Sequence, residues 1–250
     1  MTEPAPQPPP SGNPSEFDRY SAGYNAGMEV GLKRLAGASA ALFLEQKLEI
    51  LLDELRRAGR LRTDPSFRYL DFGCGAGDFL SLVARRGLQW SCEGCDVSRG
   101  MLQEARKRWP RDLQSIPLWP IEPNRFPAAR FDLISAVCVF HHIPPDQWIE
   151  SLRRLKDALV PGGWLAVFEH NPWNPATNYV VRRTEIDRNA VLLSPAVARD
   201  RLAAAGFGKP RTRFFLFAPP RFKFLWPAEK LLARVPLGGQ YVLFAQKDSG

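Results

Sequence analysis

The three histidines of this 250-residue chain are its most evident candidates for acid–base chemistry. His141 and His142 close the apolar segment "FDLISAVCVFHH", and His170 follows Glu169 at the end of "WLAVFEH". Imidazole can exchange a proton near neutral pH, so each histidine is a candidate catalytic base. A purely structural role is the alternative for each of them. The three histidines can lie in one site only if these apolar segments are strands that end at the same edge of a sheet.

Three glycines gather in the stretch "YLDFGCGAGDFL", at positions 73, 75 and 77. Glycine permits positive φ and removes the Cβ, so a ligand can rest against the backbone at the start of a helix. Asp96 ends the next apolar segment, "CEGCD". An acidic side chain at that strand tip can accept both hydroxyls of a ribose. The two features together predict a nucleoside-binding site.

The spacing of the glycines restricts the kind of nucleoside. Asp71 leads a D-x-G-x-G-x-G pattern, and the G-x-G-x-x-G spacing that suits a pyrophosphate is absent. Asp71 is placed to pair with a cationic group. The pattern therefore favours an ammonium-bearing nucleoside without phosphates over a dinucleotide.

The elements that must position these residues alternate regularly from residue 67 onward. Short apolar segments alternate with amphipathic ones, which predicts a parallel sheet covered by helices on both faces. Two later segments, "RTRFFLFAP" and "QYVLFAQK", are expected to pair antiparallel at a sheet edge. The sequence thus predicts an α/β, Rossmann-like, doubly wound and mostly parallel sheet.

The chain is long enough for one domain with a substantial hydrophobic core and some additional segments. The proline-rich residues 1–15 are predicted to be a disordered tail, and 16–250 a single domain. Within that domain we expect N-terminal cap helices over 16–60, a ligand-binding core over 67–170, and a substrate rim with C-terminal strands over 171–250.

These motifs resemble those of class I S-adenosylmethionine-dependent methyltransferases. The resemblance rests on "LDFGCGAGDF", "GCDVSRGML", "FDLISAVCVFHHI" and "LKDALVPGGWLAVFEH", and it covers residues 67–170. It implies a seven-stranded sheet with an antiparallel last strand, and S-adenosylmethionine as the cofactor. The ordered motifs are specific for the superfamily and unspecific for the methyl acceptor.

The resemblance also implies which residues meet the cofactor. Asp71 and the glycine loop would hold the methionine portion, Asp96 the ribose hydroxyls, and Val97 or Met101 the adenine. Glu122 stands near the place where relatives often have an aspartate facing adenine, and an exposed loop acid is its alternative role. The full predicted cofactor set is Asp71, Gly73, Cys74, Gly75, Gly77, Asp96, Val97, Met101, Glu122 and Val137.

Methyl transfer from a sulfonium is an in-line displacement, so the protein mainly positions the acceptor. A hydroxyl acceptor needs a base, whereas a carboxylate attacks unaided. His141, His142 and His170 are the predicted catalytic candidates. A second histidine at the position of His142 recurs in relatives with diverse acceptors, which also suggests a structural or cofactor-side role.

The segment "EHNPWNP" is predicted to form a rigid rim, because two Asn-Pro steps favour extended or turned backbone there. Trp173 could stack on an acceptor, while the asparagines could bind hydroxyls or cap turns. Core packing is the alternative for the two N-terminal tyrosines, and a basic helix face for the arginine. The predicted substrate residues are Tyr20, Tyr24, Glu169, Asn171, Trp173, Asn174 and Arg182.

The net charge of +8 comes from the C-terminal segment Val180–Gly250, which has 13 basic and 5 acidic residues against 21 of each before it. A solvated basic face is one interpretation, and attraction of an anionic acceptor is the other. The arginines are scattered rather than clustered, so no nucleic-acid partner is expected.

Four cysteines include the pair Cys92 and Cys95, but this pair lies inside an expected strand and lacks two further ligands. No metal site is therefore expected. No run of eighteen apolar residues and no signal-like N-terminus is present, so we expect a cytoplasmic protein without membrane insertion.

The sequence predicts S-adenosylmethionine-dependent methyl transfer to a small molecule, namely a hydroxyl of a sugar-like or secondary-metabolite acceptor that could carry an anionic group. N- or carboxyl methylation of a small metabolite is one alternative. A non-catalytic S-adenosylmethionine-binding scaffold is another, although the intact glycine loop and Asp96 weigh against it. Nucleic-acid methylation is disfavoured because "HHIPPD" replaces an N-P-P-[YF]-like motif.

Overall fold

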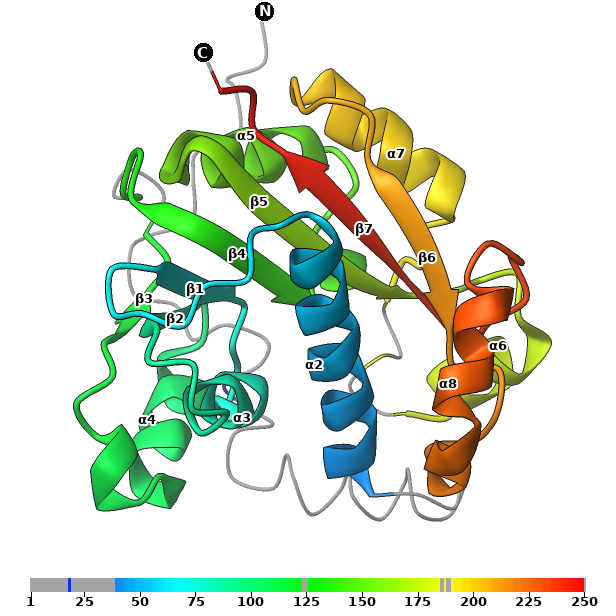
Figure 1. The fold of residues 1–250 in the computed structure, drawn as a ribbon, viewed down its shortest axis with the longest axis horizontal. Helices are drawn as coiled ribbons and strands as arrows, with labels where there is room; N and C mark the ends of the chain where they lie inside the picture. The colour runs from blue at the N-terminus through cyan, green and yellow to red at the C-terminus, as the bar shows by residue number, and fades with distance from the viewer. Residues whose placement is uncertain (1–17, 19–38, 123–125, 185–186, 188–189, 250) are drawn as a thin grey trace, which may run out of the picture.

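A seven-stranded sheet forms the centre of the protein (Figure 1). The computed structural model describes residues 18, 39–122, 126–184, 187 and 190–249. The strand order is β3-β2-β1-β4-β5-β7-β6. Strands β1 to β5 are parallel, and β7 runs antiparallel to both β5 and β6. The strands are β1 (Arg68–Phe72), β2 (Ser91–Asp96), β3 (Leu118–Pro120), β4 (Phe131–Val137), β5 (Leu159–His170), β6 (Arg211–Phe215) and β7 (Gln240–Gln246). The predicted sheet is confirmed.

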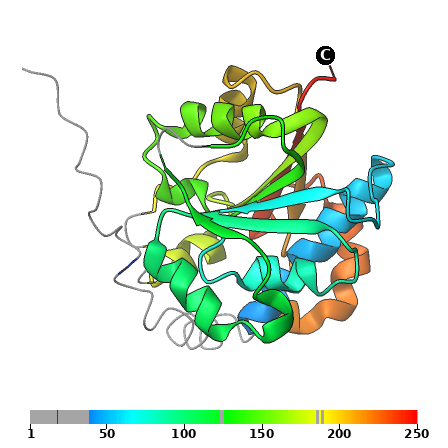
Figure 2. The same cartoon turned by 90° about the vertical axis from the view of Figure 1, so that its left-hand side faces the viewer.

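Helices cover both faces of this sheet (Figure 2). One hydrophobic cluster joins one face to α2, α3 and α4, and a second joins the other face to α5 and α7. The α-helices are α2 (Ala40–Arg57), α3 (Asp78–Ala84), α4 (Arg99–Arg108), α5 (Trp148–Ala158), α6 (Pro175–Val181), α7 (Pro195–Ala204) and α8 (Trp226–Glu229). The doubly wound architecture predicted from the alternation is therefore correct.

The packing follows from the apolar pattern of each element. Strand β7 is buried at every position but its last, as expected for a strand covered on both faces. Helix α5 buries Trp148, Leu152, Leu155 and Ala158, which are spaced by three or four residues and so share one face. None of the described helices is long and apolar enough to cross a membrane.

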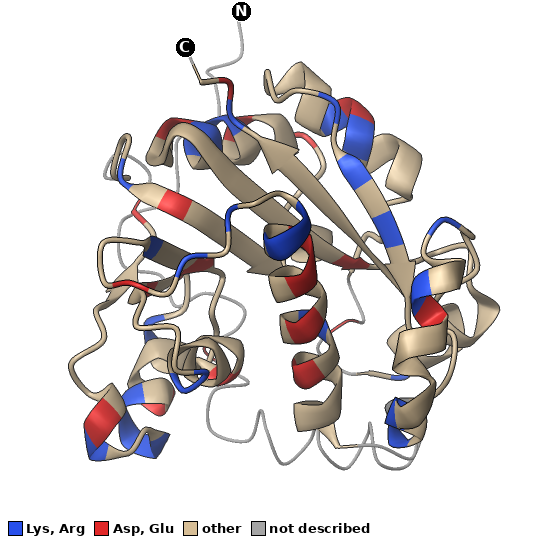
Figure 3. Ribbon diagram, in the orientation of Figure 1, with Lys and Arg blue, Asp and Glu red and all other residues tan. Residues whose placement is uncertain are grey.

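Basic residues of the C-terminal segment hold helix α2 against the sheet edge. Arg213 of β6 is buried and contacts Asp53 at 2.6 Å and Glu54 at 3.3 Å. Arg211 and Lys230 form further ion pairs with these two acids. The other Lys and Arg residues are distributed along many helices and strands of the ribbon (Figure 3). Part of the basic excess of the C-terminal segment thus stabilises the fold by pairing with acids of α2.

The bounds of three elements differ from the prediction or were not predicted. Strand β3 is only three residues long and ends in proline, so alternation alone did not reveal it. Strand β5 begins at Leu159, earlier than "WLAVFEH" suggested. The turned backbone predicted after β5 is confined to 171–174, since α6 already starts at Pro175. The predicted tail, Tyr20 and Tyr24 lie outside the described residues.

Candidate functional site

The glycine loop follows β1 and turns the chain into α3. Gly73, Gly75 and Gly77 all have positive φ, at 68°, 53° and 75°. The N–H groups of Gly73 and Cys74 donate to the Cys95 carbonyl, and that of Gly75 donates to Asp96 Oδ2. Gly77 N–H donates to the Cys74 carbonyl. These amides are paired within the protein, so they do not form a cradle for a phosphate.

Two of the three glycines make room for the protein's own side chains. A Cβ on Gly73 would lie 2.6 Å from Val139 Cγ2, and one on Gly77 would overlap the Trp109 ring. A Cβ on Gly75 would only touch Met101, at 3.4 Å. Close packing within the protein therefore explains why residues 73 and 77 are glycines. The sequence pattern had suggested only that these glycines make space for a ligand. The same packing places the turn after β4 directly against the glycine loop.

Two buried carboxylates flank the loop. Asp96, at the tip of β2, accepts hydrogen bonds from Gly75 N–H and Ser98 N–H, both at 2.8 Å. Burial raises its pKa despite these bonds. Asp71, in β1, accepts a hydrogen bond from Ser135 Oγ at 2.8 Å. Burial raises the pKa of Asp71 to about 7, so a cationic partner would stabilise its charged form.

The histidine cluster begins where β4 ends. Cys138 adopts φ of 58°, which turns the chain into the 3-10 turn η3 (Phe140–His142). The buried His141 ring contacts Glu169, the penultimate residue of β5, with 2.6 Å between Nδ1 and Oε2. The other oxygen of Glu169 accepts the Phe140 N–H at 2.8 Å. One buried carboxylate thus fixes both the turn and the His141 ring.

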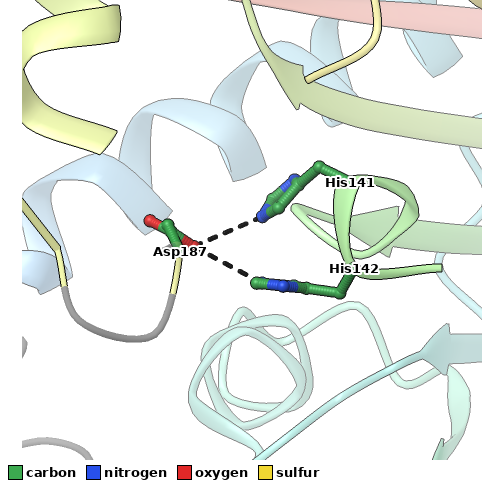
Figure 4. Close-up of side chains that lie close together, drawn as sticks. All are labelled: His141, His142 and Asp187. Atoms are coloured by element: carbon green, nitrogen blue, oxygen red, sulfur yellow. Dashed lines mark ion pairs between the residues drawn. The ribbon is translucent and has the colours of Figure 1, made fainter. Parts of the chain in front are cut away.

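Asp187 reaches this cluster from a distant part of the chain (Figure 4). Its Oδ1 lies 3.5 Å from His141 Nε2 and 3.4 Å from His142 Nε2. The His170 ring centroid is 5.2 Å from that of His141. His170 Nδ1 lies 3.2 Å from Gln240 Nε2. All three histidines therefore gather at the carboxyl ends of β4 and β5.

Their charge states differ because their neighbours differ. Burial lowers the pKa of His141, but the Glu169 and Asp187 carboxylates outweigh burial and raise it well above the ordinary value. Burial and the charge of His141 lower the pKa of both His142 and His170 to about 4. Within this cluster His141 favours its protonated form, whereas His142 and His170 favour their neutral forms.

A comparison with known protein families identifies the chain. The family described as "Methyltransferase domain" matches residues 42–216. The chain belongs to the methyltransferase domain family. This match confirms the predicted class I S-adenosylmethionine-dependent methyltransferase family, with S-adenosylmethionine as its cofactor.

Curated relatives resemble the core of this methyltransferase. A trans-aconitate 2-methyltransferase of Rhodopseudomonas palustris (strain BisB18) is 36% identical over 107 residues, which are 42% of this chain and 39% of that protein. Aklanonic acid methyltransferase DauC of Streptomyces sp. (strain C5) is 36% identical over 103 residues, 40% of this chain and 46% of that protein. The chain thus spans less than half the length of these two relatives.

Solved structures support the fold of the methyltransferase. A possible histamine N-methyltransferase from Thermotoga maritima superposes with a TM-score of 0.62 at 18% identity. The superposition covers 93% of this chain and 98% of that one. At this identity the likeness concerns the fold alone.

The residues of the loop fit S-adenosylmethionine. The cofactor has no phosphate, which agrees with loop amides that are already paired. It carries an ammonium and a ribose, and the buried carboxylates of Asp71 and Asp96 suit these two groups. When bound, S-adenosylmethionine supplies a methyl group activated on a sulfonium. Asp71 would hold the ammonium group and Asp96 the ribose hydroxyls, and both contacts remain predictions.

The other predicted cofactor residues surround the same loop. Met101 is buried beneath Gly75, whereas Val97 is half exposed after β2. Glu122 is partly exposed and forms an ion pair of 3.5 Å with Arg99 through one carboxylate oxygen. Cys74 is buried in the loop and Val137 closes β4. Their contacts with the cofactor remain predictions.

The predicted substrate rim is strongly tied to the protein. Asn171 is fully buried, and its amide donates to the carbonyls of Pro236 and Gly238. Asn174 caps α6 by accepting the Thr177 N–H at 3.0 Å. These bonds favour the turn-capping alternative over substrate contact for both asparagines.

Among the described members of the predicted substrate set, Trp173 and Arg182 are exposed, on either side of α6. Glu169 is fully buried and already bound by His141 and by the η3 backbone. It therefore positions His141, while substrate contact remains a prediction for Trp173 and Arg182.

Sequence reasoning missed several residues of the site. Asp187 lies 45 positions beyond His142, and no periodicity connects them. Lys47 is buried on α2, and burial lowers its pKa against the opposing effect of Cys138 and Glu169. A lysine on the apolar face of a helix is a signal that could have revealed it. Asp18 accepts hydrogen bonds from Ser98 Oγ and Gly100 N–H, two residues that closely follow Asp96 in the chain.

Proposed function

We propose that this chain transfers the methyl group of S-adenosylmethionine to a carboxylate oxygen of a small organic acid. The observation that carries the proposal is the contact between the glycine loop and the turn that bears the histidines. A Cβ on Gly73 would lie 2.6 Å from Val139 Cγ2, and Val139 is two residues before His141. The histidine cluster therefore adjoins the part of the loop assigned to the methionine end of the cofactor, where the methyl group is transferred.

The chemistry of the cluster suits an acceptor that needs no base. Both oxygens of Glu169 are engaged by the turn and by His141, and His141 is buried between two carboxylates. These groups are positioned rather than free to take a substrate proton. A carboxylate acceptor attacks the methyl group without losing a proton, so the protein needs only to orient it and exclude water.

The names of two relatives support an acidic acceptor. Both the trans-aconitate methyltransferase and the aklanonic acid methyltransferase are named for substrates that are acids. An anionic acceptor also agrees with the net charge of +8.

A hydroxyl of a sugar-like or secondary-metabolite acceptor is the second candidate. It is favoured by the three imidazoles that gather at the carboxyl ends of β4 and β5, because imidazole is the usual base for a hydroxyl. His142 is the candidate base in that case, since its side chain is partly exposed whereas His141 is not.

The test uses S-adenosylmethionine carrying a trideuterated methyl group. The purified chain is incubated with this donor and, separately, with di- and tricarboxylic acids, aromatic acids, sugars and phenols, and the products are analysed by mass spectrometry. We expect a labelled product from an acid that mild alkali hydrolyses, as a methyl ester requires. An alkali-stable label found only on hydroxyl compounds would refute carboxyl methylation and support the second candidate. Cofactor binding without any transfer would support the scaffold alternative.

A further inference from the structure

We propose that His141, His142 and Asp187 bind a divalent transition-metal ion. The rings of the two histidines project from η3 toward the Asp187 carboxylate (Figure 4). One nitrogen from each ring and one carboxylate oxygen lie within 4.8 Å of one another. No other such group of three occurs among the described residues.

The distances between Asp187 and the two histidines are long for direct hydrogen bonds and are compatible with a shared ion. Asp187 Oδ1 lies 3.5 Å from His141 Nε2 and 3.4 Å from His142 Nε2. A good N–H···O hydrogen bond measures about 2.7 to 3.2 Å. An ion bound tetrahedrally at about 2.1 Å from each ligand separates neighbouring ligand atoms by about 3.4 Å. Both separations match that tetrahedral edge.

Glu169 supplies the outer support that metal-binding histidines require. Its Oε2 lies 2.6 Å from His141 Nδ1, so it orients the ring with Nε2 directed at Asp187. Such a carboxylate fixes the tautomer of the histidine and makes it a better ligand. Glu169 is itself held by the N–H groups of Val139 and Phe140. The candidate site therefore has both metal-binding side chains and a buried carboxylate that orients one of them.

The donor set selects the class of metal. Two imidazole nitrogens and one carboxylate oxygen suit Zn²⁺, Fe²⁺, Co²⁺ or Mn²⁺, whereas Mg²⁺ and Ca²⁺ prefer sites made of oxygen alone. Three protein ligands leave at least one coordination position for another molecule, as in catalytic metal sites. His142 and Asp187 are partly exposed, so that position can be reached from outside.

The metal gives a specific role to the cluster, and this step rests on the proposed function. A metal ion held by His141, His142 and Asp187 would coordinate a carboxylate oxygen of the acceptor and hold the acid in place for the methyl group. The position and positive charge of the ion would then select an acidic acceptor, and the reaction would need no catalytic base. The metal site itself does not depend on this role.

Metal content is measured without cofactor or acceptor. The chain is stripped with a chelator and dialysed against Zn²⁺, and bound metal is determined by mass spectrometry. Co²⁺ is then added to the stripped chain, and its visible absorption reports a low-coordinate nitrogen–oxygen site. We expect one ion per chain, and at least tenfold weaker binding in His142→Ala and in Asp187→Asn.

Two variants serve as matched controls for metal binding. His170→Gln removes a neighbouring imidazole that contacts Gln240, and Asp146→Asn removes an exposed carboxylate; both are expected to bind one ion as tightly as the wild type. No stoichiometric binding by the wild-type chain would overturn the proposal, whatever the variants do. Undiminished binding by both ligand variants would place the ion elsewhere, for example on cysteine, and would overturn it equally.

Activity then separates the two proposals. A chain that binds one ion but methylates no acid would refute the proposed function and leave the metal site intact. Ester formation that is unchanged after complete metal removal would refute a role of the ion in holding the acceptor.

Discussion

His141 and Glu169 are joined across the carboxyl ends of β4 and β5 by a contact of 2.6 Å between Nδ1 and Oε2, with both side chains almost completely buried. Burial raises the pKa of this carboxyl group, but the charge of His141 and the hydrogen bonds from His141 and Phe140 N–H together outweigh burial and lower it. Because the same carboxylate binds the η3 backbone, this pair links the stability of the fold to the geometry of the candidate site.

Glu169→Gln should strongly destabilise the protein. The substitution leaves buried His141 without the charge of its partner, and breaking one side of a buried ion pair typically costs about 3 to 5 kcal/mol. The free energy of unfolding from urea titration checks this. Glu150→Gln, which removes an exposed carboxylate paired with Arg154, is the control and should change stability by less than about 1 kcal/mol. Equal effects of the two changes would contradict the structural role of Glu169.

Gly73→Ala should be far more costly than Gly87→Ala. Both glycines have positive φ, at 68° and 77°, so backbone strain is similar. An added Cβ meets Val139 at Gly73 and nothing within 4 Å at Gly87. We expect about 1 kcal/mol of destabilisation at Gly87 and at least about 2 kcal/mol more at Gly73.

The double variant Gly73→Ala with Val139→Ala isolates the steric part of that cost. Removing the valine methyls should recover stability relative to the sum of the two single changes, a coupling measurable by a double-mutant cycle. Additive costs would show that the contact with Val139 is not the reason for glycine at position 73.

Asp71 should make stability depend on pH in a particular direction. Its pKa is about 7 in the folded protein, against about 3.9 for an unperturbed aspartate. The folded chain therefore binds a proton that the unfolded chain lacks between these values, so stability falls as pH rises from about 4 to 7 and stays lower above 7. The loss amounts to at most about 4 kcal/mol.

Asp71→Asn should remove this pH dependence. We expect the stability difference between variant and wild type to shift in favour of the variant from pH 5 to pH 8, measured by urea unfolding at each pH. The exposed Asp146→Asn serves as the reference. A difference that does not change with pH would mean that Asp71 is ionised throughout this range.

Asp96→Ala should weaken S-adenosylmethionine binding by at least tenfold. The variant loses the carboxylate expected at the ribose and also frees the N–H groups of Gly75 and Ser98, and hydrogen bonds to charged groups contribute about 1.5 to 3 kcal/mol. Calorimetric titration with S-adenosylmethionine checks this. Asp112→Ala, at an exposed surface ion pair with Arg85, is the control and should bind normally. Unchanged affinity in Asp96→Ala would disprove the ribose assignment.

The sequence by itself determined the fold class, the glycine loop and the acidic tip of β2. These features depend on local chemistry, namely apolar runs long enough for buried strands, amphipathic helices, and glycines where φ is positive. It also located all three histidines at strand ends. Strand β3 was not predicted, because three residues ending in proline show no alternation of apolar and polar side chains.

Only the tertiary structure decided what surrounds those residues. Asp187 joins His141 and His142 through a fold that brings a distant segment to the ends of β4 and β5, and no spacing in the sequence encodes that meeting. The same holds for Val139 and Trp109 against the glycines, and for Arg213 against the acids of α2. Side-chain types and their order are local properties, whereas charge states and packing arise from neighbours that only the folded chain brings together.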